Sequence, residues 1–323
     1  MLENVRVTEM EVSGEVDLIC HVQNDFVQLS TFIVLEKRKC YIYKARKMQF
    51  FVFSCGRLEE NVYFCTQMMI KMGMIEQLNE LFAVMVSGTD VDSDSALVRT
   101  GIAVLRHQPD IKADEMPLST LNVLLSEKHD KGRVPVVAFP AGSKDTDIKN
   151  AITSAIEDFI ISESGLGSNV AQGLRYIADE IIDNITEHAD TEDGYVSAMW
   201  DGNAVTVCIA DAGKTIYGSY IDGNFDQIYS DQVALQAAVS GVSTKNLPGA
   251  ENRGYGISTS ADMVVRGLNS TIFMLSGRGF LLRDGIRNDF TELPEPIFMP
   301  GTLVCFSIPI RKDGFSLYNH IGG

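Results

Sequence analysis

The sequence predicts an α/β (α+β) protein with two domains, and three observations support this prediction. Short apolar runs of strand length alternate along the chain with longer segments of helical periodicity. A length of 323 residues suits two domains, since a domain commonly contains about 100–200 residues. Recognisable chemical motifs occur only in the second half. We therefore expect a smaller α/β domain of unassigned role at residues 1–150 and a second domain at residues 151–323.

The first domain is predicted from its strand and helix patterns alone. Apolar runs at residues 32–35, 40–43 and 50–53 are typical of short strands. Apolar residues then recur mostly at three- and four-residue steps over residues 61–84, which predicts a helix with one buried face. A further buried strand is expected at residues 134–139. None of these segments carries residues that indicate a chemical function.

Composition and charge limit the expected compartment and partners. The net charge is −16 and the pI is about 4.7, so the chain repels a polyphosphate backbone and no nucleic acid is expected as a partner. None of the cysteines forms a Cys-x-x-Cys pair, which does not favour zinc and suits the reducing cytoplasm. The sequence shows neither a signal-peptide pattern nor an apolar run of about 18 residues. We expect a soluble, cytoplasmic protein without membrane insertion.

A long amphipathic helix is predicted from Asn169 to Ala189. Its apolar positions return every three or four residues and form one continuous stripe. Glu180, Asn184 and His188 follow one another at four-residue steps, so they share a second face beside that stripe. A solvated helix surface also carries such residues. The functional interpretation of this face therefore depends on the motifs that follow it.

Each of these three polar residues suits the handling of a metal-bound phosphate. Magnesium prefers oxygen ligands and usually binds through few protein groups together with phosphate oxygens, so the carboxamide oxygen of Asn184 is the candidate metal ligand. Glu180 is the candidate catalytic residue, because a carboxylate can orient or deprotonate an attacking water. His188 is a candidate phosphate contact, and an ordinary surface histidine fits its position equally well.

Two strands and a tight turn follow the predicted helix. Residues 194–200 and 204–210 have strand character, and the Asp-Gly-Asn between them indicates a hairpin. The second strand runs directly into Asp211 and Gly213. An Asp at a strand end, beside a glycine that permits close backbone approach, suits hydrogen bonding to the amino group of a purine. A plain turn has the same sequence, so the motif gains meaning only in company with others.

Glycines and basic residues come before a second functional helix, predicted at residues 257–266. Free amides at the start of a helix point along the positive end of its dipole and favour phosphates. Gly254 and Gly256 stand at this start, and Lys245 and Arg253 are candidates for additional positive charge. All four are therefore candidate ligand-binding residues.

The remaining segments of the second half complete a sheet. A short helix is expected at residues 231–239, and residues 271–276 and 279–283 are typical of a hairpin. A closing strand is expected at residues 300–309. It begins with a Gly-Thr pair, whose Thr302 is a further candidate ligand-binding residue.

Taken in order, these segments resemble the GHKL superfamily of ATP-binding domains, which includes gyrase-type topoisomerases, the ninety-kilodalton heat-shock chaperone, sensor histidine kinases and mismatch-repair ATPases. The resemblance covers residues 169–310. The positions that match the four family motifs are Glu180 with Asn184, Asp211 with Gly213, Gly254 with Gly256, and Gly301 with Thr302. The residues after Asn184 are closest to the histidine-kinase-like branch. No single motif is specific, whereas four in this order are.

The resemblance implies a C-terminal two-layer α/β sandwich of the histidine-kinase-like ATPase type, with helices over a mixed, mostly antiparallel sheet. It also implies ATP and Mg²⁺ as cofactors. Asn184 would hold the metal, Asp211 would read the adenine amino group, and the Gly-x-Gly ending at Gly256 would lie near the phosphates. One position departs from the family pattern, because Thr215 stands where the second motif has its last glycine.

Two classes of function follow from the resemblance. The first is a slow Mg-dependent ATPase or nucleotide switch that acts on a protein partner in signalling. The alternative is a histidine kinase or an anti-sigma-type serine kinase whose acceptor lies on another protein. No acceptor histidine stands in a kinase-like helix, and Pro109 argues against a helix that continues past His107. Binding without catalysis and assembly as a homodimer are further alternatives.

Overall fold

The structure is a computed structural model that divides into two compact units, Met1–Glu76 and Gln77–Gly323. It describes residues 6–10, 18–24, 29–36, 39–44, 50–54, 74–87, 94–126, 132–142, 146–242 and 255–309. Since β-strands and helices occur in both halves of the chain, the α/β class predicted from the sequence is confirmed.

The first unit contains a five-stranded antiparallel sheet in which each strand pairs with the next along the chain. Its strands are β1 (Arg6–Met10), β2 (Leu18–Asn24), β3 (Leu29–Glu36), β4 (Lys39–Lys44) and β5 (Phe50–Ser54). The three predicted strands fall within β3, β4 and β5 and are confirmed. Strands β1 and β2 were not predicted from the sequence.

The second unit is built on an eight-stranded sheet with the order β12-β11-β10-β13-β9-β8-β7-β6. Its strands are β6 (Ile111–Lys112), β7 (Arg133–Pro140), β8 (Asp193–Trp200), β9 (Ala204–Asp211), β10 (Thr271–Gly277), β11 (Gly279–Arg283), β12 (Asn288–Glu292) and β13 (Met299–Pro309). Among these described strands, only β6 and β7 run parallel. Every strand predicted after residue 130 is confirmed, and β6 and β12 are additional.

Helices of the second unit connect these strands. They are α2 (Ala96–Arg106), α3 (Leu118–Ser126), α4 (Thr146–Phe159), α5 (Ser168–His188), α6 (Ile216–Asp222), α7 (Asp231–Val239) and α8 (Tyr255–Asp262), and residues 74–87 are also helical. Single turns of other helix types occur at Ala113–Glu115, Ile160–Ser164 and Met263–Gly267. No helix in the described part of the chain is long and apolar enough to cross a membrane.

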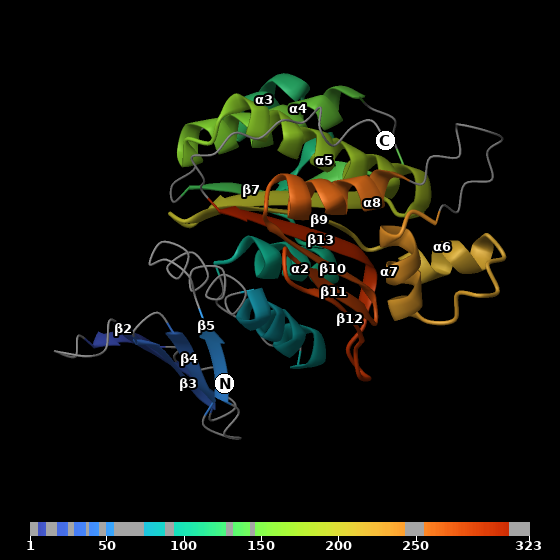
Figure 1. Cartoon of the computed structure of the whole chain (residues 1–323). Helices are drawn as coiled ribbons and strands as arrows, with labels where there is room; N and C mark the ends of the chain where they lie inside the picture. The colour runs from blue at the N-terminus through green and yellow to red at the C-terminus, as the bar shows by residue number, and fades with distance from the viewer. Residues whose placement is uncertain are drawn as a thin grey trace. The chain divides into compact units, whose positions relative to one another are not determined.

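Helices cover both faces of the eight-stranded sheet. Helices α3, α4, α5 and α8 lie on one side of it, and α2 lies on the other (Figure 1). On the α5 side, Leu174 and Ile177 join one core with Val207 and Phe306 of the sheet. On the α2 side, the Thr100 hydroxyl lies 2.6 Å from that of Ser197 on β8. Helices thus lie against both faces of the eight-stranded sheet, and the two-layer sandwich that the resemblance implies for residues 169–310 stays a prediction.

The boundary between the units also differs from the predicted one. We expected the first domain to end at residue 150, whereas the two units meet between Glu76 and Gln77. The reason lies in strand pairing, since β7 pairs antiparallel with β8 and β6 pairs parallel with β7. The residues from α2 to α4 thus belong to the same fold as the motifs, and a strand pattern alone does not reveal its pairing partner.

The predicted helices agree with the structure where it describes them. The helix expected from Asn169 to Ala189 is α5, and the one expected at residues 231–239 is α7. The helix expected at residues 257–266 is α8 followed by the π-helical turn Met263–Gly267. Of the helix expected at residues 61–84, the first thirteen residues lie outside the described chain, and the rest is helical. As expected, no helix continues past His107, which is the left-handed C-cap of α2.

Candidate functional site

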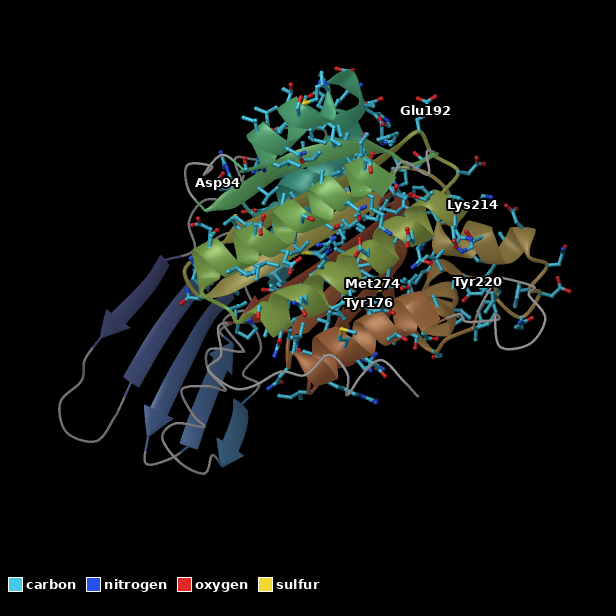
Figure 2. The ribbon with its side chains drawn as sticks, turned by 90° about the horizontal axis from the view of Figure 1, so that it is seen from above. Asp94, Tyr176, Glu192, Lys214, Tyr220 and Met274 are labelled. Carbon is cyan, nitrogen blue, oxygen red and sulfur yellow. The ribbon has the colours of Figure 1, made fainter. Side chains whose placement is uncertain are left out.

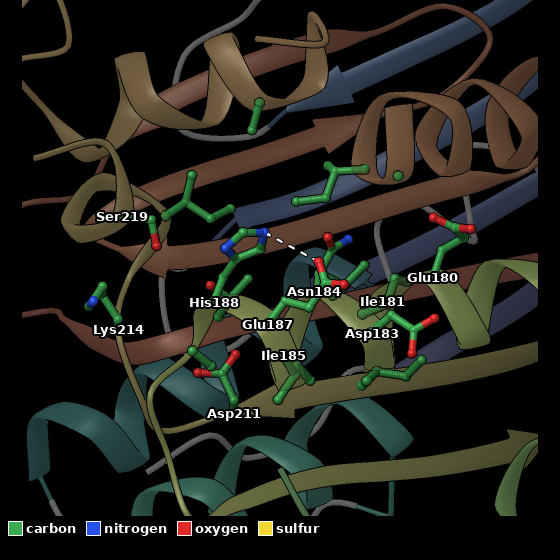
Figure 3. A pocket seen from close by; sticks show the side chains of 18 of the residues that line it. Glu180, Ile181, Asp183, Asn184, Ile185, Glu187, His188, Asp211, Lys214 and Ser219 are labelled. Atoms are coloured by element: carbon green, nitrogen blue, oxygen red, sulfur yellow. Dashed lines mark ion pairs between the residues drawn. The ribbon is translucent and has the colours of Figure 1, made fainter. Parts of the chain in front are cut away.

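A cavity of about 330 Å³ lies where α5, α6 and α8 meet the end of the sheet. Its lining includes Glu180, Asn184, His188, Asp211, Gly256 and Thr302, all of which the sequence analysis selected. Figure 3 shows the first three spaced along α5, with Asp211 at the end of β9. Four segments that are far apart in the sequence thus contribute their candidate residues to one cavity.

The other predicted residues have different positions. Gly213 lies beside the cavity and is not part of its lining. Lys245, Arg253 and Gly254 lie outside the described residues. The cavity also brings in residues that the sequence analysis did not select, among them Asp183, Glu187, Lys214, Ile216, Ser219 and Tyr220. The apolar part of the lining includes Ile181, Ile185, Ile209, Ile257 and Val304.

The polar face of α5 forms one wall of the cavity. Glu180 and Asn184 lie beside the start of α8, since a Cβ on Gly256 would come within 3.1 Å of both side chains. A side chain at this position would make the two neighbouring side chains shift by a few tenths of an ångström. One turn before Glu180, the Tyr176 hydroxyl hydrogen-bonds to the Glu180 carboxylate. Burial first, and the Glu180 charge second, raise the pKa of Tyr176, so this hydroxyl keeps its proton and acts as a donor.

Another part of the lining is formed by Asp211, which is only 2% exposed. Its Oδ1 accepts a 2.8 Å hydrogen bond from the Gly213 amide, and the carboxylate also accepts one from the Thr302 backbone. Burial raises the pKa of Asp211 to about 7, and these two backbone hydrogen bonds oppose the shift. The carboxyl group therefore changes its protonation state near neutral pH.

Two glycines make this end of the cavity close-packed. A Cβ on Gly213 would collide with the carbonyl oxygen of Ala189, the C-cap of α5. The neighbouring Lys214 amide donates to that same carbonyl at 2.5 Å. A Cβ on Gly301, whose φ is +68°, would collide with Asp211 itself. The turn after β9, the end of α5 and the start of β13 are therefore fixed against one another.

Helix α6 closes the side of the cavity and was not predicted. Thr215, the residue that departs from the family's glycine pattern, is its N-cap, and its hydroxyl accepts from the Gly218 amide at 3.0 Å. Tyr220 of α6 is buried and donates a 2.5 Å hydrogen bond to the Val242 carbonyl. In Figure 2, Lys214 and Tyr220 lie at the same end of the unit, and Tyr176 lies further along α5.

The Ser276 hydroxyl, which lies behind the cavity wall, connects the start of α6 with the Gly301–Thr302 segment of β13. Ser276 of β10 is 1% exposed, and its Oγ accepts a 2.9 Å hydrogen bond from the Ile216 amide at the start of α6. The same Oγ lies 3.0 Å from the Gly301 carbonyl oxygen and 3.0 Å from the Thr302 hydroxyl. Ser276 itself does not line the cavity.

The described lining carries more acidic than basic groups. Its carboxylates are Glu180, Asp183, Glu187 and Asp211, and its basic side chains are Lys214 and His188. Lys214 forms a 2.5 Å ion pair with Asp222, and His188 lies 3.8 Å from the Glu187 carboxylate. An anionic ligand in this part of the cavity would therefore need a cation of its own.

The Asn184 side chain suits a metal that is held mainly by its ligand. Its amide nitrogen is buried and has no hydrogen-bond partner in the described part of the chain. An Asn that is not engaged elsewhere can turn its oxygen toward a magnesium ion. Within the described ranges there is no cluster of three or more His, Cys, Asp or Glu side chains that could hold a metal without a ligand.

No protein-family model, curated protein or solved structure matches this chain. Its function is therefore inferred from the geometry and chemistry of the site.

Proposed function

We propose that this chain is an ATP-binding protein of the GHKL kind and a slow Mg-dependent ATPase that acts as a nucleotide switch on a protein partner. One observation carries the proposal: residues predicted from four separate ATP-binding motifs line the same cavity. If these motifs were only turns and surface positions, their residues would not be expected to line one cavity. The cavity volume of about 330 Å³ also falls within the range of small-molecule sites.

The two ends of the cavity suit the two ends of ATP. The Asp211 carboxylate, with apolar side chains such as Ile209 and Val304 beside it, suits a flat base that presents an amino group. The start of α8 lies beside Glu180 and Asn184, so the positive end of its dipole suits the phosphates.

Magnesium fits the second end. Asn184 would hold it together with phosphate oxygens, and the ion would neutralise charge on the phosphates where the described lining is acidic. Glu180, one turn away, would orient or deprotonate the attacking water, a role that its hydrogen bond from Tyr176 supports by fixing the carboxylate. Slow turnover is expected, since Glu180 is half-buried and, among the residues that the structure describes, the Tyr176 hydroxyl is its one donor and no larger relay is present.

The test is calorimetric titration of the full chain with ATP and GTP, with and without Mg²⁺. We expect ATP to bind in preference to GTP, and more tightly with Mg²⁺. Asn184→Ala should remove most of the Mg²⁺ dependence, and Asp211→Asn should remove most of the preference for ATP. Matched controls are Asn203→Ala and Asp226→Asn, which change exposed residues outside the cavity and should leave both properties intact. Equal binding by wild type, Asn184→Ala and Asp211→Asn would contradict the proposed site.

A further inference from the structure

The buried hydroxyl of Ser276 has three polar neighbours, and its chemistry decides how they share protons. A serine hydroxyl has one hydrogen to donate and two lone pairs to accept with. The Ile216 amide can only donate, so it occupies one lone pair. The Gly301 carbonyl can only accept, so it requires the Ser276 hydrogen. One lone pair of Ser276 is then left for the Thr302 hydroxyl at 3.0 Å.

The number of hydrogens and lone pairs on Ser276 decides the direction of its hydrogen bond with the Thr302 hydroxyl. If Ser276 donated to Thr302 instead, its Oγ would face the Gly301 carbonyl oxygen at 3.0 Å with no hydrogen between the two atoms. Leaving a buried acceptor unpaired costs about 1–3 kcal/mol. The arrangement in which every group is satisfied has Thr302 donating its hydroxyl hydrogen to Ser276, away from the cavity.

We propose that Ser276 is a specificity-determining positioning residue, which holds the Thr302 hydroxyl as a hydrogen-bond acceptor toward the cavity and so selects a ligand that presents a primary amino group. This inference rests on the proposed function. Thr302 lines the cavity, and its hydroxyl hydrogen is donated to Ser276, so its oxygen can only accept hydrogen bonds from a ligand. The Asp211 carboxylate beside it, already bonded to the Gly213 and Thr302 amides, also accepts when ionised.

Two acceptors side by side match the two hydrogens of an exocyclic amino group. A carbonyl oxygen at the same place would face two acceptors and no donor, and such a mismatch of buried polar groups discriminates strongly. A purine with a 6-amino group should therefore bind well, and one with a 6-carbonyl group poorly. Ser276 contributes without touching the ligand, because it decides which way the Thr302 hydrogen points.

The experiment compares the dissociation constants of ATP and inosine triphosphate, which carries a carbonyl oxygen in place of the amino group. Titrations are done at pH 8, with wild type and Ser276→Ala. Wild type should bind ATP at least about tenfold more tightly than inosine triphosphate. In Ser276→Ala the Thr302 hydrogen loses its acceptor and is free to turn toward a carbonyl, so the ratio should fall by about tenfold, which corresponds to about 1.4 kcal/mol. A merely structural role would weaken both ligands alike and leave the ratio unchanged, which would overturn the inference.

A double-mutant cycle shows whether Ser276 acts through Thr302. Thr302→Val should itself lower the ratio, and Ser276→Ala added to it should lower the ratio no further. An equal additional fall would overturn the inference. If Ser276→Ala does not fold, Ser276→Cys is used in its place. A thiol is a weaker acceptor than a hydroxyl, so this variant should give an intermediate ratio of the two dissociation constants. A ratio equal to that of wild type would count against the inference. Failure of wild type to bind ATP would instead refute the proposed function.

Discussion

The two ends of the cavity differ in how completely they are built. At the Asp211 end the carboxylate is buried, accepts from two backbone amides, and is enclosed by glycines that leave no room for a side chain. At the Glu180 end the side chains are half-buried, and the Asn184 amide nitrogen has no partner in the described part of the chain. The polar groups of the first end are thus paired within the protein, whereas the proposed ligand would supply partners at the second end.

This difference indicates a division of labour. A site whose polar groups are already fixed recognises shape and hydrogen-bond pattern, because little ordering is needed on binding. A site with unpaired groups and excess negative charge depends on a cation and on phosphate oxygens to become complete. Changes at the Asp211 end should therefore affect folding and affinity, and changes at the Glu180 end should affect turnover and metal dependence.

The largest effect is expected for Gly213→Ala. Its Cβ would collide with the Ala189 carbonyl, a backbone atom that cannot move without displacing the end of α5. We expect the free energy of unfolding to fall by about 3 kcal/mol or more, and ATP binding to be lost. Urea denaturation and titration measure the two effects. Gly142→Ala is the matched control, because no atom of the described residues lies within 4 Å of a Cβ placed there. Equal stability of the two variants would contradict the close packing.

Glu180→Gln tests the opposite end and should leave folding unchanged. Gln keeps the shape of the side chain and cannot accept a proton from water. We expect ATP hydrolysis to fall by about 10²–10⁴-fold while the dissociation constant of ATP changes less than about threefold. Phosphate release and titration provide the measurements. Glu192→Gln, a substitution outside the cavity, is the control. Hydrolysis at the wild-type rate would exclude Glu180 as the catalytic residue.

The pH dependence of stability should report on Asp211. Its pKa is raised from 3.8 to about 7 in the folded state, so the folded protein holds a proton that the unfolded chain releases above pH 4. Stability from this group is therefore present at low pH and is lost as pH rises through about 7. At about 1.4 kcal/mol per unit, the loss between pH 5 and pH 8 amounts to about 2–3 kcal/mol.

Asp211→Asn removes this titration. The free energy of unfolding is measured against pH for both proteins. The difference between the two profiles should give the pH dependence that Asp211 contributes, since both proteins share the other ionisable groups. Parallel profiles for the two proteins would show that Asp211 does not titrate between pH 5 and pH 8. Because an amino group prefers the ionised carboxylate, ATP binding should also tighten as pH rises from 6 to 8, with release of a proton.

The smallest effect is expected for Tyr176→Phe. The loss of one hydrogen bond to the Glu180 carboxylate should reduce turnover by about 3–10-fold and leave the dissociation constant of ATP unchanged. A change in affinity with unchanged turnover would show that Tyr176 acts only in packing.

The sequence predicted those parts of the site whose residue types are tied to backbone geometry. Glu180 and Asn184 could be placed on one helix face because helical periodicity fixes which residues are neighbours. Asp211 could be placed at a strand end because the apolar run stops there. Glycines at the turn and at the start of α8 marked close approaches, and the structure shows such approaches at Gly213 and Gly256.

Other parts depend on tertiary contacts that no local pattern reveals. Helix α6 has only 7 residues, with Gly218 among them, and it is held by the Thr215 cap and by burial of Tyr220, so its own sequence gives no helical periodicity to recognise. Ser276 is one serine within an apolar strand, and only the β10–β13 register places it opposite Thr302. Likewise, the pairing of β7 with β8 could not be predicted from either strand alone.

That pairing has a practical consequence for anyone who wishes to work with a shorter version of the protein. A fragment that starts at residue 151 would contain every motif but would lack β7, leaving one side of β8 without its hydrogen-bonded neighbour. The freed edge would present Val196 and Ala198, which are buried in the full chain, to other molecules. Exposed apolar edge strands recruit one another and aggregate. A fragment that starts near residue 77 keeps the edge covered and is the better choice for expression and crystallisation.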